Sequence, residues 1–493
     1  MTTIRNICAV DIGAESGRVL LGCYDGERLS TRVVHRFLNR PVRLAGTLCW
    51  DTPSLYAEML VGLRLAAQQA GGPIASVGID TWGSDFGMLD ARGDLLGLPV
   101  HYRDSRTDGL IDEVLTHLPA QDLYRKSGIV FWPFNSLIQL RALALRRSPL
   151  LREGHTLLFT PDLLHYWLSG VKGCERTIAS SSQCLAVDRD VWLDDVLATL
   201  DIPTHFFPAV TPTGSILGPL RPEVAAEIGA EMQVIAPAGH DTLSAFIAAP
   251  ITSPDDAYIS CGTWSIVGIE TDAPIVTPAA FAAGVMNQQS IEGRYSLPRN
   301  NMGLWLVQQT RAVLAREGRQ YDYAVLAEMA EQAAPFTAWI DPNDMRFYAP
   351  ENMVEAVQTS CAESGQPVPR EVKDLMRCLL ESLAFAHRTA IEEFEALRGS
   401  RVPAVHIIGG GSQNRTLCQW TANALGRPVI AGPAEATAMG NLSLQLKALG
   451  EIANLREIRQ VVRQSTELIA YTPQETPAWN EAYERYRQVT KKE

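Results

Sequence analysis

The fold of this chain is decided by residues 10–19, which read VDIGAESGRV. Short apolar runs at residues 7–10 and 19–21 flank a glycine-bearing turn, a pattern that predicts two adjacent strands joined as a hairpin. Gly13 and Gly17 permit backbone angles at which several N–H groups point at one anion. The hairpin is therefore predicted to face a phosphate, with Asp11 facing a metal bound to it. An ordinary hairpin with a surface aspartate is the alternative that this stretch alone leaves open.

The bulk properties of the chain predict a globular protein of more than one domain. Its 493 residues exceed what one hydrophobic core usually serves, so two large or three small domains are expected. A formal net charge of -12 argues against a nucleic-acid partner and against binding to an anionic membrane. No apolar run approaches the roughly 18 to 20 residues that span a bilayer, so the cytoplasm is the expected location.

The cysteines and histidines show no metal-binding pattern. The nine cysteines contain no C-x-x-C pair, and the nine histidines contain no H-x-x-x-H spacing. Most of the cysteines are expected to be buried apolar thiols. Cys361 and Cys378 flank a loop with glycine and proline and could approach one another, but free thiols are expected in a reducing compartment.

Strands and helices alternate along most of the sequence, which favours an α/β fold. Residues 47–51, 75–80 and 156–160 read as strands or strand ends, and Pro53 stands where the first helical position would fall. The predicted buried face of that helix consists of Leu55, Met59, Leu60, Leu63 and Ala66. Residues 248–256 contain two prolines and are polar, so they are the expected junction between domains 1–247 and 248–493.

Two further segments extend this pattern after the junction. Residues 257–268 repeat the order of apolar strand, hydroxyl-and-glycine turn and apolar strand. They indicate a duplicated unit, and two unrelated hairpins remain the alternative; two facing hairpins would clamp a polyphosphate in a cleft. Residues 406–414 read as a strand entering a helix through three glycines, which would let a flat ring approach the backbone. Neither a dinucleotide fingerprint nor a Walker loop occurs.

With these elements in order, the chain resembles the FGGY carbohydrate kinases of the actin and hexokinase ATPase superfamily. The likeness covers nearly the whole chain and is greatest to members that act on L-rhamnulose. Its motifs include GIDTWGSDF at 78–86, GHDT at 239–242 and NNMGLWLVQ at 300–308. The remaining motifs are residues 10–18, 102–107, 260–265, 409–414 and 434–441. The resemblance implies a two-domain actin/hexokinase-like ATPase fold, built from ribonuclease H-like duplicated domains, with ATP and sugar in the interdomain cleft.

The resemblance also implies the residues of the acceptor site. Asp241 corresponds to the general base, and Gly83 and His240 to sugar contacts. From the sequence alone Asp241 opens an apolar segment that reads as a helix, so an N-cap is its alternative role, and the two roles are compatible. Trp82 either walls the pocket or packs in the core. Arg103, Asp104 and Arg106 either close the sugar side or brace the domain.

The nucleotide contacts are implied in the same way. The corresponding residues are Ala14, Glu15, Ser16, Gly17, Arg18, Thr263, Asn300, Gln308 and Gly410. The first hairpin and Thr263 would take phosphates, Gly410 would lie near the adenosine, and Asp11 would hold Mg²⁺ through water. A carboxylate aimed at a triphosphate would be repelled, so Glu15 is expected to use only its backbone N–H and to turn its side chain toward Arg18 or solvent.

The activity implied by the resemblance is transfer of the γ-phosphoryl group of ATP to the C1 hydroxyl of L-rhamnulose in rhamnose breakdown. Another ketose, such as L-fuculose or xylulose, remains an alternative, because a few hydroxyl contacts decide sugar identity. A non-enzymatic ATP switch of the same superfamily is a second alternative, although it would not need Gly83, His240 and Asp241 together. A DNA-binding regulator is disfavoured, because no helix-turn-helix or basic extension precedes residue 7.

Overall fold

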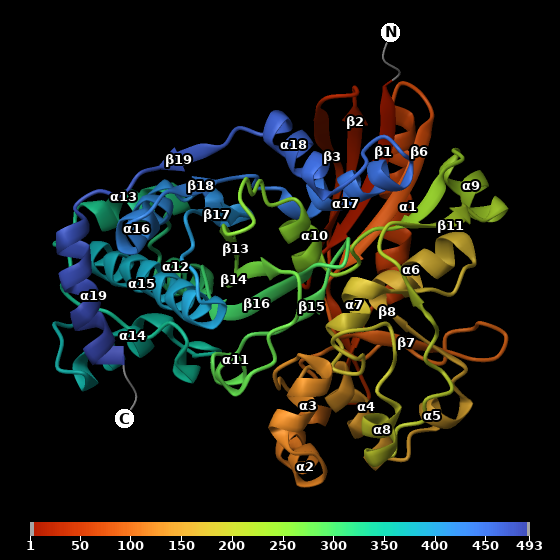
Figure 1. The fold of residues 1–493 in the computed structure, drawn as a ribbon, viewed down its shortest axis with the longest axis horizontal. Coiled ribbons are helices and arrows are strands. Elements are labelled where there is room, and N and C mark those ends of the chain that lie inside the picture. Colours follow the sequence, from red (N-terminus) through yellow and green to blue (C-terminus); the bar gives the residue numbers. More distant parts are fainter. Residues whose placement is uncertain (1–3, 491–493) are drawn as a thin grey trace. The chain divides into compact units, whose positions relative to one another are not determined.

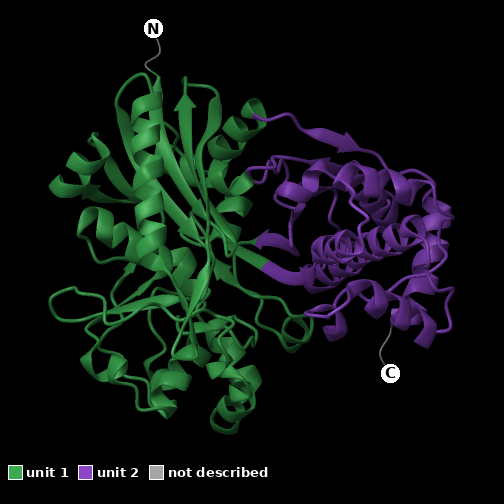
Figure 2. Cartoon of the chain, turned by 180° about the vertical axis from the view of Figure 1, so that it is seen from behind, with its two compact units in different colours: residues 1–248, 271–297, 436–465 green, residues 249–270, 298–435, 466–493 purple. Residues whose placement is uncertain are grey.

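The structure, a computed structural model that describes residues 4–490, divides into two compact units (Figures 1 and 2). Unit 1 comprises Met1–Ala248, Thr271–Leu297 and Ala436–Ser465, and unit 2 comprises Ala249–Glu270, Pro298–Glu435 and Thr466–Glu493. Unit 2 thus lies wholly after residue 248, whereas unit 1 also takes two segments from the second half of the sequence. Helices and strands alternate in both units, as the α/β prediction requires.

Unit 1 is built on a six-stranded sheet with the order β11-β12-β6-β1-β2-β3. These strands are β1 (Arg5–Ile12), β2 (Ser16–Tyr24), β3 (Leu29–Leu38), β6 (Ile74–Thr81), β11 (Ser215–Pro219) and β12 (Gln233–Ala236). β1 runs antiparallel to β2 and parallel to β6. The apolar run that opens the chain therefore lies at the centre of this sheet.

Both faces of this sheet are covered by helices, which explains why β1 is apolar at nearly every position. Cys8 and Val10 face a core shared with α1 (Thr52–Gln69), α6 (Thr160–Ser169) and α9 (Pro222–Ile228). Ile7 and Ala9 face the opposite core, shared with α10 (Asp241–Ile247), α17 (Ala436–Ala448) and α18 (Leu455–Ser465). The helix that carries Asp241 thus shares this second core, where it packs on α17 and contacts β6, the neighbour of β1.

Helix α1 confirms the predicted apolar face. Leu55, Met59, Leu60, Leu63 and Ala66 are all buried. The helix begins one residue earlier than predicted, because the carboxylate of Asp51 caps it by accepting a hydrogen bond from the Ser54 N–H at 3.2 Å. Pro53 is consequently its second residue rather than its first, a position that also needs no N–H donor.

Unit 1 contains further elements outside this sheet, and most of them share a separate hydrophobic core. The other helices are η1 (Ser105–Thr107), α2 (Leu110–His117), α3 (Ala120–Ser127), α4 (Ser136–Leu145), α5 (Pro149–Glu153), α7 (Arg176–Ser180), α8 (Asp194–Thr199) and α11 (Pro278–Ala282). The short strands are β4 (Pro41–Leu44), β5 (Thr47–Trp50), β7 (Phe86–Leu89), β8 (Thr156–Phe159), β9 (Cys174–Glu175), β10 (Val210–Thr211) and β15 (Gln288–Gln289). β8 and β6 confirm the strands predicted at 156–160 and 75–80, to within one or two residues at each end.

Unit 2 contains a second sheet in which β16, β14, β13, β17, β18 and β19 follow one another. These strands are β13 (Ala257–Cys261), β14 (Trp264–Thr271), β16 (Tyr295–Met302), β17 (Val405–Ile408), β18 (Val429–Ala431) and β19 (Ile469–Tyr471). The helices are α12 (Trp305–Arg316), α13 (Tyr323–Glu331), η2 (Met345–Phe347), α14 (Met353–Glu363), α15 (Val372–Arg398), η3 (Gly410–Gln413), α16 (Arg415–Leu425) and α19 (Thr476–Thr490). The antiparallel β13–β14 hairpin and the passage from β17 into α16 both confirm the sequence prediction.

Candidate active site

The first predicted phosphate hairpin is present as β1 and β2. The Gly13 N–H donates to the Ser16 carbonyl at 2.9 Å and closes the turn between the two strands. Asn39 holds the turn from outside, because its side-chain amide donates to the Gly13 carbonyl at 3.0 Å and its backbone N–H donates to the Glu15 carbonyl at 3.0 Å. The turn is therefore fixed through its carbonyl groups.

Gly17 of this hairpin serves a different purpose from the predicted one. Neither Gly13 nor Gly17 has a positive φ, so the expectation that both supply unusual backbone angles is wrong. A Cβ on Gly17 would instead overlap the ring of Phe37, which lies on the neighbouring strand β3. Gly17 is thus required for space, a need that arises from strand pairing and not from the turn itself.

The charged groups of the hairpin are already organised. Asp11 is buried, and its Oδ2 accepts hydrogen bonds from Arg18 Nη2 at 2.7 Å and from Arg18 Nε at 3.0 Å. Glu15 is exposed, as expected for a side chain that does not face a phosphate. Arg18 therefore brings a positive charge to the end of β1, where Asp11 brings a negative one.

A second buried acid, Asp80, lies beside Asp11. The two residues are partners in the parallel register of β1 and β6. Asn441 Nδ2 donates to Asp80 Oδ2 at 2.6 Å, whereas Asp80 Oδ1 is buried and finds no partner within residues 4–490. Burial and the charge of Asp11 raise the pKa of Asp80 well above its usual range. Sequence reasoning gave Asp80 no role, although an apolar strand that ends in Asp, as β1 does, is a usable signal.

Asp241 is the first residue of α10, and His240 occupies the N-cap position. The Asp241 carboxylate accepts from its neighbour Thr242, through N at 2.5 Å and Oγ1 at 3.1 Å. This is not the bond of a capping residue, so the N-cap alternative is wrong. The side chain is 30% exposed, and its partial burial together with the charge of Asp11 raises the pKa of Asp241 to about 7.

The three residues predicted for the acceptor site lie together in unit 1. His240 Nε2 is 3.7 Å from Asp241 Oδ1, and a Cβ on Gly83 would lie 3.2 Å from the same nitrogen. That Cβ would also lie 3.6 Å from the hydroxyl of Ser181, a residue that sequence reasoning missed. Burial lowers the pKa of His240 to about 4, so this imidazole is neutral near pH 7.

The residues around Gly83 form a buried polar network. The indole N–H groups of Trp50 and Trp82 donate to Asp85 Oδ2 at 2.5 and 3.0 Å, and the two rings pack with centroids 4.0 Å apart. Trp82 therefore packs in the core. Arg106 is also buried and donates to Gln139, which donates in turn to Asp85. Of the two readings of the 103–106 segment, this network supports bracing of the domain.

Unit 2 brings two of the predicted nucleotide residues together. Thr263 lies in the turn between β13 and β14, and its Oγ1 donates to Gln308 Oε1 on α12 at 3.3 Å. The Thr263 carbonyl accepts from Gly303 N and Trp305 N, both at 3.2 Å, so the turn is held against the start of α12. Asn300 lies on β16, the neighbour of β14 in the sheet.

The three consecutive glycines of unit 2 differ in what they provide. Gly409 has a φ of +79°, a backbone angle that residues other than glycine rarely adopt. A Cβ on Gly411 would lie 2.6 Å from the Cβ of Cys261, so Gly411 is needed for packing against β13. A Cβ on Gly410 would meet nothing within 4 Å. Gly410 is therefore the glycine that borders open space, where a flat ring could approach.

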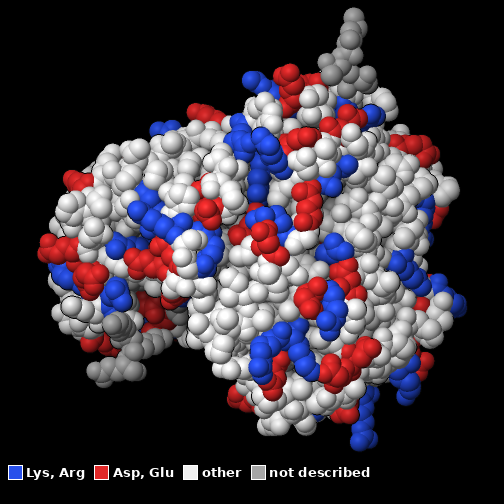
Figure 3. Space-filling model, in the orientation of Figure 1, with Lys and Arg blue, Asp and Glu red and all other residues white. Residues whose placement is uncertain are grey.

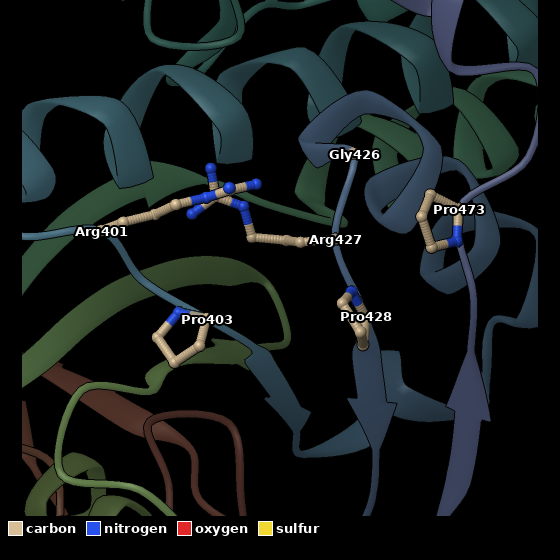
Figure 4. Close-up of a pocket in the computed structure, with 6 residues that line it drawn as sticks. All are labelled: Arg401, Pro403, Gly426, Arg427, Pro428 and Pro473. Carbon is tan, nitrogen blue, oxygen red and sulfur yellow. The ribbon is translucent and has the colours of Figure 1, made fainter.

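A separate cavity of about 500 Å³ lies in unit 2 (Figure 4). It is lined by Arg401, Pro403, Gly426, Arg427, Pro428 and Pro473, none of which is a predicted site residue. Arg427 is already engaged, because its Nη1 donates to Glu395 Oε1 at 2.5 Å and to the Val402 carbonyl at 2.6 Å. The cavity is therefore not part of the candidate site.

Other kinds of site find little support in residues 4–490. No group of three or more His, Cys, Asp or Glu side chains in that range is arranged to hold a metal ion, and no helix in it is long and apolar enough to cross a membrane. All nine cysteines are free thiols, Cys361 and Cys378 included. On the face drawn in Figure 3, acidic and basic side chains are interspersed.

Models of two domains match the sequence. The N-terminal domain of the FGGY family of carbohydrate kinases matches residues 6–248, and the C-terminal domain of that family matches residues 257–449. The chain belongs to the FGGY family of carbohydrate kinases. It is therefore a sugar kinase, and the family predicted from its motifs is confirmed.

The relatives of this FGGY kinase cover nearly its full length. It is 41% identical to "Rhamnulokinase" from Enterobacter sp. (strain 638) over 473 residues, which are 96% of this chain and 95% of the relative. It is 40% identical to "Rhamnulokinase" from Klebsiella pneumoniae (strain 342) over 474 residues, again 96% and 95% of the two chains.

Solved structures show the same fold at low sequence identity. Xylulose kinase from Lactobacillus acidophilus has a TM-score of 0.81 at 16% identity and covers 98% of this chain and 97% of its own. Plasmodium falciparum glycerol kinase with ADP has a TM-score of 0.80 at 15% identity and covers 99% of both chains. The predicted actin/hexokinase-like fold is thereby confirmed.

Proposed function

We propose that this FGGY kinase transfers the γ-phosphoryl group of ATP to the C1 hydroxyl of L-rhamnulose, giving L-rhamnulose 1-phosphate and ADP. The identity of 40 to 41% to two proteins named Rhamnulokinase, over 96% of the chain, supports this substrate. The observation that carries the proposal is the Asp241 carboxylate at the start of α10, whose Oδ1 lies 3.7 Å from His240 Nε2, the nitrogen that Gly83 also approaches.

The proposed role of Asp241 is to orient the C1 hydroxyl and to accept its proton as the oxygen attacks the γ-phosphorus. A general base works best when its pKa lies close to the working pH, and burial brings Asp241 into that range. His240 is neutral, so it offers the sugar a hydrogen-bonding group without a charge. Gly83 leaves room beside His240 Nε2, where a Cβ would stand at 3.2 Å.

The proposed nucleotide contacts are divided between the two units. In unit 1 the turn at residues 14–18 would contact phosphate oxygens, and Arg18 supplies a positive charge there. In unit 2 Thr263, held against Gln308, would take phosphate as well. Gly410 borders open space that suits the adenosine, and Asn300 completes the proposed set. ATP carries both a triphosphate and an adenosine, so it is the ligand that these proposed contacts would fit.

The acids of unit 1 fit a divalent cation. Asp11 and Asp80 are strand partners, and one oxygen of Asp80 is buried without a partner within residues 4–490. Mg²⁺ keeps much of its water shell and is commonly held by one or two carboxylates together with substrate phosphates, so a cage of three protein ligands is not required. We assign Asp11 as the residue that would hold Mg²⁺, with Asp80 as the neighbouring acid on the adjacent strand. When bound, the ion would neutralise charge on the β- and γ-phosphates.

The remaining assignments are secondary proposals. Another ketose, such as L-fuculose or xylulose, is the nearest alternative substrate, since a few hydroxyl contacts separate these sugars. We also propose a cytoplasmic location, supported by nine free thiols, and no nucleic-acid or membrane partner, supported by the net charge of -12.

The test is ADP release measured across a panel of ketoses with wild type and Asp241→Asn. We expect L-rhamnulose to give the highest kcat/KM, and Asp241→Asn to lower kcat at least about 10²-fold, because general-base catalysis contributes roughly 10²- to 10⁴-fold. Calorimetric titration should show ADP binding close to wild type. The matched control is Asp272→Asn, because Asp272 is an exposed residue that forms an ion pair with Arg294. This variant should keep full activity. Near-normal turnover by Asp241→Asn would refute the assignment of the base.

A further inference from the structure

Glu175 is a buried carboxylate that belongs to none of the FGGY motifs. It ends the short strand β9, is fully buried, and occupies the N-cap position of α7. Its Oε2 accepts from Gly239 N at 2.9 Å, Thr177 Oγ1 at 2.5 Å and Ile178 N at 3.2 Å. Its Oε1 accepts from Thr177 N at 2.9 Å and from the hydroxyl of Thr213. Both oxygens are therefore committed to protein donors.

One of these donors belongs to the segment that leads into Asp241. Gly239 precedes Asp241 by two residues, and its N–H reaches Glu175 across 64 positions of sequence. The next N–H, that of His240, donates at 3.3 Å to Thr177 Oγ1, which itself donates to Glu175. On the other side the Gly239 carbonyl accepts from Thr81 N at 2.9 Å. The backbone before Asp241 is thus held from two sides.

The same helix reaches the neighbourhood of Gly83. Ser181 directly follows α7, and its hydroxyl stands 3.6 Å from where a Cβ of Gly83 would lie. Ser180 Oγ accepts from Gln289 N at 3.2 Å. The N-terminus of α7, fixed by Glu175, is therefore joined to the approach to Asp241, while its C-terminus borders Gly83.

Capping α7 does not require this residue. Ser, Thr, Asp or Asn is the usual cap, because a short side chain reaches the second or third N–H of a helix. Glu175 does cap α7, but it also reaches Gly239, and a Cβ on Gly239 would lie only 3.2 Å from Glu175 Oε2. A buried carboxylate is costly unless several donors satisfy it, and here the donors come from three separate segments.

We infer that Glu175 is the positioning residue of the acceptor site: it fixes the Gly239–His240 backbone and thereby the place of the Asp241 carboxylate. The inference rests on the proposed function, because it takes Asp241 as the base. Glu175 itself touches neither sugar nor nucleotide. Loss of Glu175 should therefore lower kcat, because a displacement of about 1 Å destroys the alignment of the reacting atoms.

The experiment compares kcat and the KM for ATP in wild type, Glu175→Ala and Glu175→Gln. In Glu175→Ala the Gly239 and Thr177 N–H groups lose their acceptor, and we expect kcat to fall about 100-fold with the KM for ATP within twofold of wild type. In Glu175→Gln the amide oxygen can still accept from Gly239, so kcat should return to within about fivefold of wild type. Rescue by glutamine identifies hydrogen bonding, and not charge, as the cause.

The matched control is Glu381→Ala. Glu381 is also fully buried and accepts from Arg377 Nε at 2.7 Å, Trp339 Nε1 at 3.0 Å and Phe336 N at 3.2 Å. We expect this variant to lose thermal stability while the folded fraction keeps the wild-type kcat. An unchanged kcat in Glu175→Ala, or an equal loss of kcat in Glu381→Ala, overturns the inference.

If Glu175→Ala does not fold, Thr177→Val decides instead. It keeps the side-chain shape but removes the acceptor of His240 N, and kcat should fall about tenfold with little change in melting temperature. A wild-type kcat in this variant overturns the inference. If wild type phosphorylates no ketose, the proposed function fails and takes this inference with it; if only the Glu175 and Thr177 variants behave as wild type, the inference alone fails.

Discussion

Gly440→Ala should slow the enzyme without altering any residue that contacts a substrate. Gly440 lies on α17, where it packs against α10, the helix that begins with Asp241. A Cβ on Gly440 would stand 2.7 Å from the carbonyl carbon of Ser244 and closer still to its oxygen. Both atoms belong to the backbone of α10, so no side chain can rotate to make room.

The size of the expected effect follows from this distance. An ordinary van der Waals contact of about 3.4 Å requires a shift of about 0.7 Å at the carbonyl carbon, and the nearer oxygen requires α10 to move further than that relative to α17. Overpacking of this kind costs about 1–3 kcal/mol of folding free energy. A displacement approaching 1 Å of a catalytic group costs about 100-fold in rate, so we expect kcat to fall roughly 10- to 100-fold.

The assay is coupled ADP release at saturating L-rhamnulose and ATP, together with a thermal melt. The control is Gly72→Ala, because a Cβ on Gly72 would meet only Asn6 Nδ2 at an ordinary 3.6 Å and should change neither kcat nor melting temperature. If Gly440→Ala is folded and turns over at the wild-type rate, the packing of α17 does not determine where Asp241 stands. That result would refute the link between this helix contact and catalysis.

Three other predictions concern pH, the nucleotide and the metal. Because the pKa of Asp241 is raised to about 7, its carboxylate becomes protonated below that pH. In a profile from pH 5 to 9, kcat/KM for L-rhamnulose should therefore be level above pH 7 and fall about tenfold for each pH unit below it; a flat acid limb would contradict the assignment. Gly410→Val should raise the KM for ATP at least about fivefold and leave the melting temperature unchanged, because its side chain would enter open space; an unchanged KM would place the adenosine elsewhere. Asp11→Asn should raise the Mg²⁺ concentration that gives half-maximal rate, and an unaltered Mg²⁺ titration would remove Asp11 from the metal site.

The elements that sequence reasoning predicted well are those that local pattern determines. The apolar runs at 7–10 and 19–21 form β1 and β2, and the face from Leu55 to Ala66 is buried in α1. Asp241 was expected at the start of a helix and is found there. Periodicity and strand–turn chemistry act over a few residues, so a single sequence records them.

The features that sequence reasoning missed depend on partners far along the chain. Gly17 is needed because Phe37 lies across from it, and no local property of the turn reveals this. Asp80 becomes part of the site through its register with Asp11 and its hydrogen bond from Asn441, which is 361 positions away. Glu175 gains its importance only when Gly239 is brought to it. Such roles are set by tertiary packing, which determines what each side chain meets.

The dependence of unit 1 on α17 has a consequence for how the protein is made. When a ribosome has produced residue 248, every strand of the six-stranded sheet exists, but α17, which helps to cover Ile7 and Ala9, begins only at residue 436. At about 5–20 residues per second, that wait lasts roughly 10–40 s. During this interval the Cys8 carbonyl lacks the hydrogen bond that Gln445 later donates to it. The apolar surface of Ile7 and Ala9 also lacks the cover of α17. We therefore expect residues 4–248 to be less stable when expressed alone than within the full chain, because part of the cover of their sheet is missing.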